Sequence, residues 1–335
     1  METILYPEEM YPDELHERRI FGADAELVFH PVTTLAELPD EVAEEVTGLM
    51  IFRLWVSDAD MARMPKLRAI VRMGVGYDRL DRAAAARRGV LICNCPDYGT
   101  TEVADHAVAL ALALRRGIIL HHDLQRADPP GGWWAADRPD LLRRAGEQGF
   151  GIVGLGRIGT AVALRAKAFG FRVVFYDPYR PNGTELALGI ERAPSLEALL
   201  PQSDVLSMHL PDTPESRGMM GAAQFAAMPA GSVFVDTARG TNMDVDALYD
   251  ALRSGHLAGA GLDVMPVEPP VEPVPKLLAA YRAREPWLEG RLVVTPHSAF
   301  WTPEAFLDIR VKSNETMRAA LLSNRPQNVI APTDF

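Results

Sequence analysis

Cysteine is scarce in this sequence and long apolar runs are missing, and each absence excludes a class of protein. The 335 residues include two cysteines, Cys93 and Cys95, which lie in one apolar stretch. Two thiols cannot form a disulfide framework or a four-ligand zinc site, so we expect both to be buried and reduced, and we expect no metal site. The longest apolar run, 107–114, has eight residues, whereas a helix that crosses a membrane needs about twenty.

Positive charge is also in short supply. The chain has 34 Lys and Arg against 45 Asp and Glu, a formal net charge of −11, and proteins that bind nucleic acids usually present a basic surface to the phosphates. Glutamates at positions 2, 8 and 9 stand where a secretion signal has its basic segment. We therefore expect a cytoplasmic protein with neither a nucleic-acid nor a membrane partner.

The remaining composition favours an ordinary globular protein with two domains. Apolar residues make up 48% of the chain and charged residues 24%, and a chain of this length usually splits into two cores. Short β-branched runs alternate with amphipathic stretches, which is typical of parallel sheets with crossover helices. We predict an α/β fold of two domains with parallel sheets: a discontinuous first domain of residues 1–100 and 300–335, and a second domain of residues 101–299.

The expected elements follow from the same pattern. Strands are predicted at 48–54, 68–72 and 90–94 in the first domain, and at 150–153, 172–176, 205–208, 232–236, 259–264 and 292–295 in the second. Long helices are predicted from Thr100 or Thr101 to about His122, and at 303–322. The stretch 128–139 is rich in Pro, Gly and Trp, which indicates a connection or an arm that reaches a second subunit.

A glycine-rich turn opens the second domain. Gly154, Gly156 and Gly159 form a G-x-G-x-x-G motif, and Asp177 closes the next predicted strand 18 residues later. The motif is weak by itself, but a strand before it, a helix after it and this acidic residue are the context of dinucleotide binding. The helix N-terminus favours a pyrophosphate. Asp177 would accept hydrogen bonds from the ribose and repel a 2′-phosphate, so we expect NAD rather than NADP.

Polar side chains end five consecutive predicted strands of this domain. They are Asp177, His209, Arg239, Asp263 and His297. Ligands of open parallel sheets bind beyond the carboxyl ends of the strands, so we expect these residues to surround one site. Glu268 follows in the loop after Asp263.

Three of these residues suit hydride transfer coupled to proton transfer. Arg239 can hold the carboxylate of a 2-keto acid and polarise its carbonyl, because a guanidinium binds oxygens with a planar fork. His297 can deliver the proton, because an imidazole titrates near neutral pH, and Glu268 would stabilise and orient its charged form. Each has a plain alternative: a surface ion pair, a packed histidine and a solvated carboxylate, respectively. For His209, cofactor contact and simple packing are equally favoured.

Four segments, 151–159 with Asp177, 236–240, 261–269 and 294–299, resemble the D-isomer-specific 2-hydroxyacid dehydrogenase family. The resemblance implies two Rossmann- or flavodoxin-like domains with parallel sheets and a cleft between them. Residues 1–100 and 300–335 would form the substrate-binding domain, and residues 101–299 the NAD-binding domain. The resemblance further implies NAD as cofactor and a small 2-keto or 2-hydroxy acid as substrate. It also implies that Arg239, Glu268 and His297 are the catalytic residues, and that Asp263 holds the nicotinamide carboxamide. It places further cofactor contacts at Gly154, Gly156, Arg157, Ile158, Gly159, Asp177, His209, Leu210, Pro211, Thr213, Thr237 and Ala238.

The resemblance extends to the substrate and to the oligomer. The segment 74–78 is similar to the loop with which the family binds the substrate carboxylate, here through the backbone N–H groups of Val75 and Gly76. Phe300 and Trp301 follow the histidine where a pocket residue is expected. The Gly-Gly-Trp-Trp segment 131–134 is similar to the arm of the family's homodimers, so we expect a homodimer.

Within the family, the stretches 161–171 and 175–179 are most similar to the C-terminal-binding-protein branch of NAD(H)-binding corepressors and their bacterial relatives. This likeness leaves a second function open, that of an NADH-sensing dimeric scaffold with little turnover. A formate- or phosphite-oxidising relative is a third possibility, although the formate type carries Gln where this chain has Glu268. Oxidation of phosphoglycerate also stays open. The segment 276–287 is longer than usual for the family, and we expect it at the surface rather than in the cleft.

Overall fold

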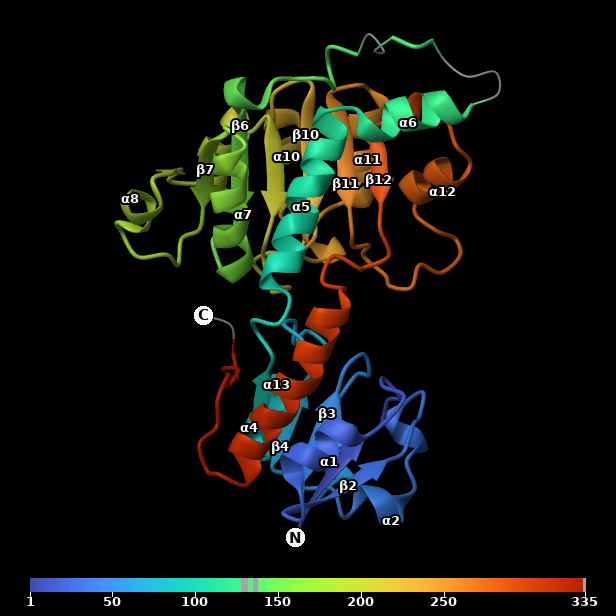
Figure 1. The fold of residues 1–335 in the computed structure, drawn as a ribbon, viewed down its shortest axis with the longest axis vertical. Coiled ribbons are helices and arrows are strands. Elements are labelled where there is room, and N and C mark those ends of the chain that lie inside the picture. Colours follow the sequence, from blue (N-terminus) through green and yellow to red (C-terminus); the bar gives the residue numbers. More distant parts are fainter. Residues whose placement is uncertain (128–131, 135–137, 334–335) are drawn as a thin grey trace. The chain divides into compact units, whose positions relative to one another are not determined.

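The computed structural model describes residues 1–127, 132–134 and 138–333. The chain divides into two compact units, unit 1 of Met1–Gly99 with Trp301–Phe335 and unit 2 of Thr100–Phe300. Each unit contains one parallel sheet with helices packed on it (Figure 1). The predicted class, two α/β domains with parallel sheets, is confirmed.

Unit 1 is built on a five-stranded sheet with the order β2-β1-β3-β4-β5. Its strands are β1 (Glu2–Tyr6), β2 (Ala25–Phe29), β3 (Gly48–Ile51), β4 (Ala69–Arg72) and β5 (Leu91–Asn94). Its helices are α1 (Leu15–Phe21), α2 (Asp40–Ala43), α3 (Asp58–Ala62), α4 (Arg82–Arg87) and α13 (Pro303–Leu321), with a 3₁₀ turn at Leu35–Glu37. Helix α13 closes the chain by packing on α1 and on strands β3, β4 and β5.

The first two strands of unit 1 were not predicted, for different reasons. Strand β2 lies at the sheet edge and buries one of its five residues, so its sequence lacks the apolar run of a central strand. Strand β1 begins with the polar residues Glu2 and Thr3. Strand β1 pairs with both β2 and β3, and β2 pairs with β1, so pairing between distant segments places both strands.

Unit 2 is built on a seven-stranded sheet with the order β12-β11-β10-β9-β6-β7-β8. Its strands are β6 (Gly149–Val153), β7 (Arg172–Tyr176), β8 (Glu191–Arg192), β9 (Val205–Met208), β10 (Ser232–Asp236), β11 (Leu257–Leu262) and β12 (Leu292–Val294). Its helices are α5 (Thr100–Arg115), α6 (Ile118–Arg126), α7 (Arg157–Ala168), α8 (Thr184–Leu188), α9 (Leu196–Leu199), α10 (Ala222–Ala227), α11 (Val245–Arg253) and α12 (Lys276–Arg282). Short 3₁₀ turns occupy Ala145–Glu147, Leu200–Gln202, Gly240–Asn242 and Pro286–Leu288.

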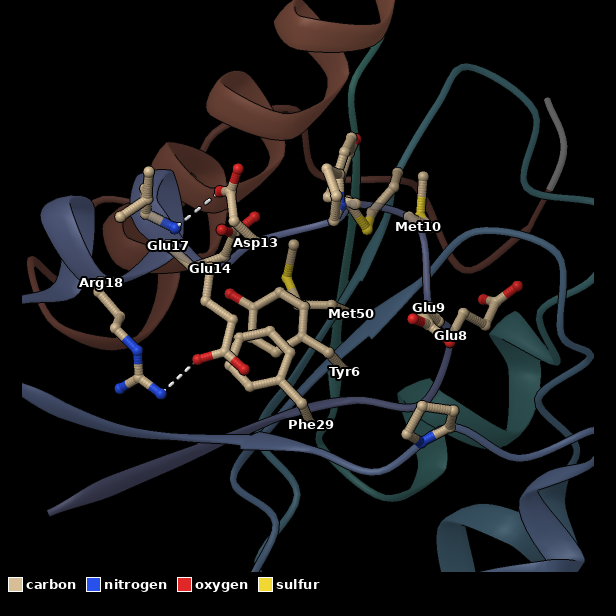
Figure 2. A pocket seen from close by; sticks show the side chains of 15 residues that line it. Tyr6, Glu8, Glu9, Met10, Asp13, Glu14, Glu17, Arg18, Phe29 and Met50 are labelled. Carbon is tan, nitrogen blue, oxygen red and sulfur yellow. Dashed lines mark hydrogen bonds and ion pairs between the residues drawn. The ribbon is translucent and has the colours of Figure 1, made fainter.

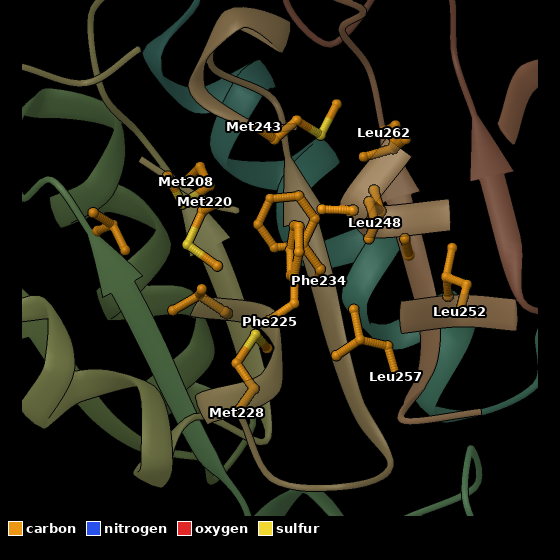
Figure 3. Close-up of a cluster of buried hydrophobic side chains, with 14 of the residues drawn as sticks. Met208, Met220, Phe225, Met228, Phe234, Met243, Leu248, Leu252, Leu257 and Leu262 are labelled. Carbon is orange, nitrogen blue, oxygen red and sulfur yellow. The ribbon is translucent and has the colours of Figure 1, made fainter. Parts of the chain in front are cut away.

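Each face of the unit 2 sheet carries its own apolar core. Helices α5 and α7 cover one face, where side chains such as Phe150, Ile152 and Val233 are buried (Figure 1). Helices α9 to α12 cover the other, where Phe225 packs edge-on against Phe234 with ring centroids 5.2 Å apart (Figure 3). A sheet buried on both faces reads as continuous apolar runs, which is why six of its strands were predictable. The seventh, β8, was not predicted, because it is a short edge strand of two charged residues that are not buried.

The prediction of one long helix from residue 100 to about 122 is wrong, because this stretch forms two helices, α5 and α6. Gly117 adopts a left-handed conformation with φ +60°, which a glycine accommodates without strain, so α5 ends at Arg115 and α6 starts at Ile118. The Arg115 guanidinium is buried and donates to the main-chain oxygens of Asp140, Gly231 and Asp204. Burial lowers the pKa of Arg115 to about 10. The arginine therefore ties the helix end to neighbouring loops.

The segment 276–287 is mostly exposed and is anchored to unit 2, whereas its expected place outside the cleft stays a prediction. It forms helix α12, whose Leu277 and Leu278 enter the core cluster beside α11. Trp287 follows and packs edge-on against Tyr249 at 5.5 Å. Most of the other side chains of the segment are exposed.

Both cysteines are buried in unit 1 and unpaired, as predicted. Burial raises the pKa of the Cys93 and Cys95 thiols to about 11, so the reactive thiolate is scarce near neutral pH. Within the described residues, no helix combines the length and apolar character needed to cross a membrane. No group of three or more His, Cys, Asp or Glu side chains in that part of the chain is arranged to hold a metal ion.

Candidate active site

The glycine-rich turn lies at the point where the strand order of unit 2 reverses. Strand β6 pairs with β7 on one side and with β9 on the other, and ligands of open α/β sheets bind at such a switch point. The backbone N–H of Gly154 donates to the main-chain oxygen of Tyr176 at 2.9 Å, and the backbone N–H of His209 donates to the main-chain oxygen of Val153 at 2.8 Å. The ends of three adjacent strands are thus fixed side by side.

The three glycines of the turn have different roles. Gly154 has φ +88°, and a Cβ there would lie 2.6 Å from the His209 oxygen. A Cβ on Gly159 would lie 2.0 Å from the Gly154 oxygen, so this glycine lets α7 pack onto the turn. Gly156 caps α7 without a side chain, and a Cβ there would meet no described atom within 4 Å. Backbone N–H groups at an uncapped helix start suit a pyrophosphate, so the cradle fits a dinucleotide.

The predicted ribose ligand, Asp177, is held beside this turn. Its Oδ2 accepts from the Leu155 N–H at 2.8 Å, and its Oδ1 accepts from the Tyr179 N–H at 2.9 Å. The Arg180 Nε lies 3.4 Å from Oδ2. The carboxylate is therefore rigid, and part of its charge is offset by a neighbouring guanidinium.

His209 is enclosed at the end of β9. Its Nε2 lies 2.9 Å from the Ser207 Oγ, and burial lowers the pKa of His209 to about 3. The imidazole is therefore neutral, and its Nε2 is partnered, whereas its buried Nδ1 has no hydrogen-bond partner among the described residues. Its predicted cofactor contact stays a prediction.

The other predicted cofactor residues lie around the same edge. Arg157 begins α7, and Ile158 and Leu210 are half-buried against the two core clusters. Thr213 and Pro211 are tied into a local turn, in which the Ser216 Oγ lies 2.9 Å from the Thr213 nitrogen and 2.7 Å from the Pro211 oxygen. Their cofactor contacts stay predictions.

Strand β10 ends in a buried carboxyl, that of Asp236, for which no role was predicted from the sequence. The Asp236 side chain is fully buried, and its Oδ1 accepts from the Ala238 N–H at 2.8 Å. Burial raises the pKa of Asp236 to about 7, against the opposing effects of that hydrogen bond and of Arg239. Thr237 and Ala238 are also buried, whereas Arg239 is half-buried and donates to the Ala238 oxygen at 2.7 Å.

Glu268 and His297 form the pair that the sequence predicted. The His297 Nδ1 lies 2.5 Å from the Glu268 Oε2, while the other Glu268 oxygen accepts from the Met265 N–H at 2.8 Å. Burial alone would raise the pKa of Glu268, but the hydrogen bond with His297 and the charges of His297 and Arg239 outweigh it and lower that pKa. The carboxylate thus stays charged, and the other ring nitrogen of His297 is left for a ligand.

Asp263 is more enclosed than its predicted contact with the cofactor implies. Its side chain is 1% exposed, and both carboxylate oxygens accept backbone N–H groups from Ser298 and Ala299. Two further residues, His106 and Thr295, join it through hydrogen bonds. Nothing in the sequence marks His106, which stands in an apolar helix, and only the packing of α5 on β11 and β12 brings it here.

The predicted substrate residues divide between the two units. In unit 1, the Val75 oxygen accepts from the Asn94 side chain at 2.7 Å, which supports the loop that contains Gly76. Trp301, also in unit 1, is 56% exposed. In unit 2, the Phe300 ring stands edge-on to the His297 ring at 6.4 Å. The substrate contacts of all four residues stay predictions.

A cavity of about 490 Å³ in unit 1 has the wrong charge for an organic acid (Figure 2). Glu8, Glu9, Asp13 and Glu14 line it, together with Arg18 and with apolar side chains such as Phe29. An anionic substrate would be repelled by this set of carboxylates. The cavity is therefore a poor candidate for the keto-acid site.

The predicted dimer arm falls partly outside the described residues. Gly131 and most of the loop 128–139 around it are among the residues that are not described. Trp133 and Trp134 are 86% and 88% exposed. The homodimer stays a prediction.

Comparison with known proteins identifies the family. Residues 108–299 match the model of the D-isomer specific 2-hydroxyacid dehydrogenase NAD binding domain. That match covers more than half of the chain. The chain belongs to this family. The family prediction is therefore confirmed, whereas the closer likeness to the C-terminal-binding-protein branch stays a prediction.

Individual relatives agree with the assignment. The chain is 40% identical over 239 residues to a glyoxylate reductase of Korarchaeum cryptofilum, covering 70% of this chain and 67% of that protein. It is 38% identical over 286 residues to a D-3-phosphoglycerate dehydrogenase of Mycobacterium leprae, covering 83% of this chain and about half, 49%, of that protein. An NADPH-dependent glyoxylate/hydroxypyruvate reductase of Sinorhizobium meliloti, solved with NADP and malonate, is 26% identical with a TM-score of 0.84, covering 100% and 98% of the two chains.

These relatives define the class of reaction. The chain is an oxidoreductase of the NAD(P)-dependent 2-hydroxyacid dehydrogenase class. The description of the family model names NAD as the bound cofactor, whereas the S. meliloti structure contains NADP. The choice between the two cofactors is therefore not decided by family membership.

Proposed function

We propose that this protein is an NAD-dependent D-2-hydroxyacid dehydrogenase that reduces a small or medium 2-keto acid, with His297 as the general acid. The observation that carries the proposal is the 2.5 Å contact between the His297 Nδ1 and the Glu268 carboxylate. A carboxylate there favours the protonated imidazole and fixes its orientation. The remaining nitrogen can then give its proton to a carbonyl oxygen.

The residues of unit 2 divide the work as follows. Arg239 binds the substrate carboxylate and polarises the carbonyl, because its guanidinium offers two parallel donors. His297 delivers the proton to the carbonyl oxygen, and Glu268, whose pKa is lowered, stays charged and sustains the imidazolium. Bound NADH supplies the hydride. In the reverse direction, His297 takes the proton from the hydroxyl group.

A matched pair of histidine variants tests the general acid. His297→Gln should lower kcat by at least about 100-fold, since general acid catalysis contributes about 10²–10⁴-fold, while NADH affinity stays within twofold of the unmodified protein. His122→Gln, at an exposed position of α6, is the control and should keep full activity. Near-full turnover by His297→Gln would contradict the assigned acid. A loss of NADH binding in that variant would point to a damaged fold instead.

The preference for NAD over NADP rests on Asp177. Its fixed carboxylate is expected to bind the ribose hydroxyls and to repel a 2′-phosphate, although Arg180, 3.4 Å away, offsets part of that repulsion. Asp177→Ala should weaken NADH binding and raise the relative use of NADPH. Arg180→Ala should have the opposite effect on the preference. Unchanged affinities and preference in Asp177→Ala would refute the ribose assignment.

The expected homodimer rests on the likeness of the segment 131–134 to the family's arm. The two exposed tryptophans, Trp133 and Trp134, would be buried in such a contact. Sedimentation equilibrium of the full chain should give twice the mass of one chain. Trp133→Ser/Trp134→Ser should shift it toward the monomer. A monomeric unmodified protein would refute the expectation.

A further inference from the structure

Asp263 gathers the loop that carries His297. Its main-chain oxygen accepts from the His297 N–H at 2.8 Å. Its Oδ1 accepts from the Thr295 hydroxyl at 2.5 Å and from the Ser298 N–H at 2.9 Å, and its Oδ2 accepts from the Ala299 N–H at 2.9 Å. One buried residue therefore holds the backbone of His297 and the chain on both sides of it.

The loop needs this support because His297 is strained. Its φ is +51°, a left-handed conformation that costs a residue with a Cβ free energy. The side chain is 41% exposed, so packing alone constrains it weakly. The hydrogen bonds to Asp263 are what keep the backbone in this conformation, and with it the direction in which the imidazole points.

The network extends one step further, to helix α5. The His106 Nε2 lies 3.0 Å from the Thr295 Oγ1 and 3.8 Å from the Asp263 Oδ1. A threonine hydroxyl has one proton, and here it is donated to the Asp263 carboxylate. The hydroxyl must then accept from His106, so the His106 Nε2 carries a hydrogen. The direction of the chain is thus set: His106 to Thr295 to Asp263.

We propose that His106 is a positioning residue for the reaction and acts through Thr295 and Asp263 on the loop that holds His297. By donating to Thr295, His106 keeps that hydroxyl turned toward Asp263, which in turn holds Ser298 and Ala299. His106 belongs to α5, and Thr295 is the residue that follows β12. The helix and the sheet therefore position the His297 loop together. This inference rests on the proposed function, in which His297 is the general acid.

Conservative and disruptive variants separate this role from simple packing. His106→Leu removes the donor, whereas His106→Gln keeps an N–H near the position of Nε2. Thr295→Val removes the hydroxyl at nearly constant volume, whereas Thr295→Ser keeps it. The readouts are kcat with a 2-keto acid that the unmodified protein reduces, the Kd for NADH, and hydrogen exchange at the Ser298 and Ala299 amides.

We expect His106→Leu and Thr295→Val each to lower kcat by about tenfold, the order expected from one lost hydrogen bond to a strongly polarised acceptor. The Kd for NADH should change less than twofold, and the two amides should exchange faster. His106→Gln and Thr295→Ser should recover kcat to within about threefold. The double variant His106→Leu/Thr295→Val should be no worse than the poorer single variant, because both changes break one chain.

Several results would overturn the proposal. One is a His106→Leu variant with unchanged kcat and unchanged hydrogen exchange at the Ser298 and Ala299 amides. Another is an equal loss of kcat in His106→Leu and His106→Gln. The third is a double variant in which the losses of kcat of the two single variants multiply. If His106→Leu fails to fold, Thr295→Val and Thr295→Ser still decide it. The exchange readout needs no turnover. An unmodified protein that reduces no keto acid would therefore contradict the proposed function, whereas unchanged exchange in the variants would contradict the inference about His106.

Discussion

Replacing Asp236 by Asn should make the protein more stable at high pH and leave it almost unchanged at low pH. The Asp236 carboxyl is fully buried, and its pKa is raised from 3.8 to about 7. Between these two values the folded chain holds a proton that the unfolded chain has lost. Stability therefore falls as pH rises through this window and levels off above pH 7. An asparagine keeps the oxygen that accepts from the Ala238 N–H and never ionises.

The size of the effect follows from the same pKa. At about 1.4 kcal/mol for each pH unit, a carboxyl held protonated from pH 3.8 to about 7 costs the folded state roughly 4 kcal/mol at pH 8. Relaxation around the charged form reduces this figure, so we expect a difference of roughly 2–4 kcal/mol between Asp236→Asn and the unmodified protein at pH 8. At pH 4.5 the difference should be about 1 kcal/mol or less.

Urea unfolding followed by tryptophan fluorescence at pH 4.5, 6 and 8 measures this difference. Asp123→Asn removes the same charge from an exposed position of α6 and serves as the control. A gap between Asp236→Asn and the unmodified protein that stays constant from pH 4.5 to 8 would refute the reasoning. It would mean that Asp236 ionises with an ordinary pKa despite its burial.

Three further predictions follow from single contacts. Glu268→Gln should lower kcat by about 10²-fold, the low end of what a general acid contributes. Because the pKa of Glu268 is lowered, its carboxylate should support His297 at every pH above the ordinary pKa of a glutamate and lose this effect only in more acidic solution, which kcat measured from pH 4 to 9 tests. Gly159→Ala should lower Tm and abolish NADH binding, because its Cβ would lie 2.0 Å from a backbone oxygen. Gly156→Ala, whose Cβ would point into open space, should keep Tm and only weaken NADH binding, and equal Tm values of the two variants would contradict the packing argument. Arg115→Met should destabilise the chain by roughly 3 kcal/mol in urea unfolding, because buried carbonyl groups lose their donor; a loss under about 1 kcal/mol would contradict this role.

Much of unit 2 could be predicted from the sequence because its signals are local. Strands buried on both faces gave continuous apolar runs, and the glycine spacing with Asp177 marked the dinucleotide turn. The polar residues that follow those runs lie together beyond the carboxyl ends of the strands, because the paired strands are parallel. The contact between Glu268 and His297 followed from the family likeness.

The parts that escaped prediction depend on contacts between distant segments. Strand β2 is an edge strand with little burial, and only its pairing with β1 defines it. His106 looks like one more residue of an apolar helix until α5 packs on the sheet and brings it to Thr295. The burial of Asp236, and hence its raised pKa, depends on the elements around β10 rather than on its neighbours in sequence.

The most direct test of the central claim is the oxidation of NADH by the purified protein in the presence of 2-keto acids. The panel is glyoxylate, hydroxypyruvate, pyruvate, phenylpyruvate, 4-methylthio-2-oxobutyrate and 2-oxoglutarate. We predict turnover of at least one of them at about 1 s⁻¹ or faster, the lower range of ordinary enzymes, with loss of that turnover in His297→Gln. Tight NADH binding without turnover of any of the six would contradict the account and favour a protein that senses NADH instead of using it.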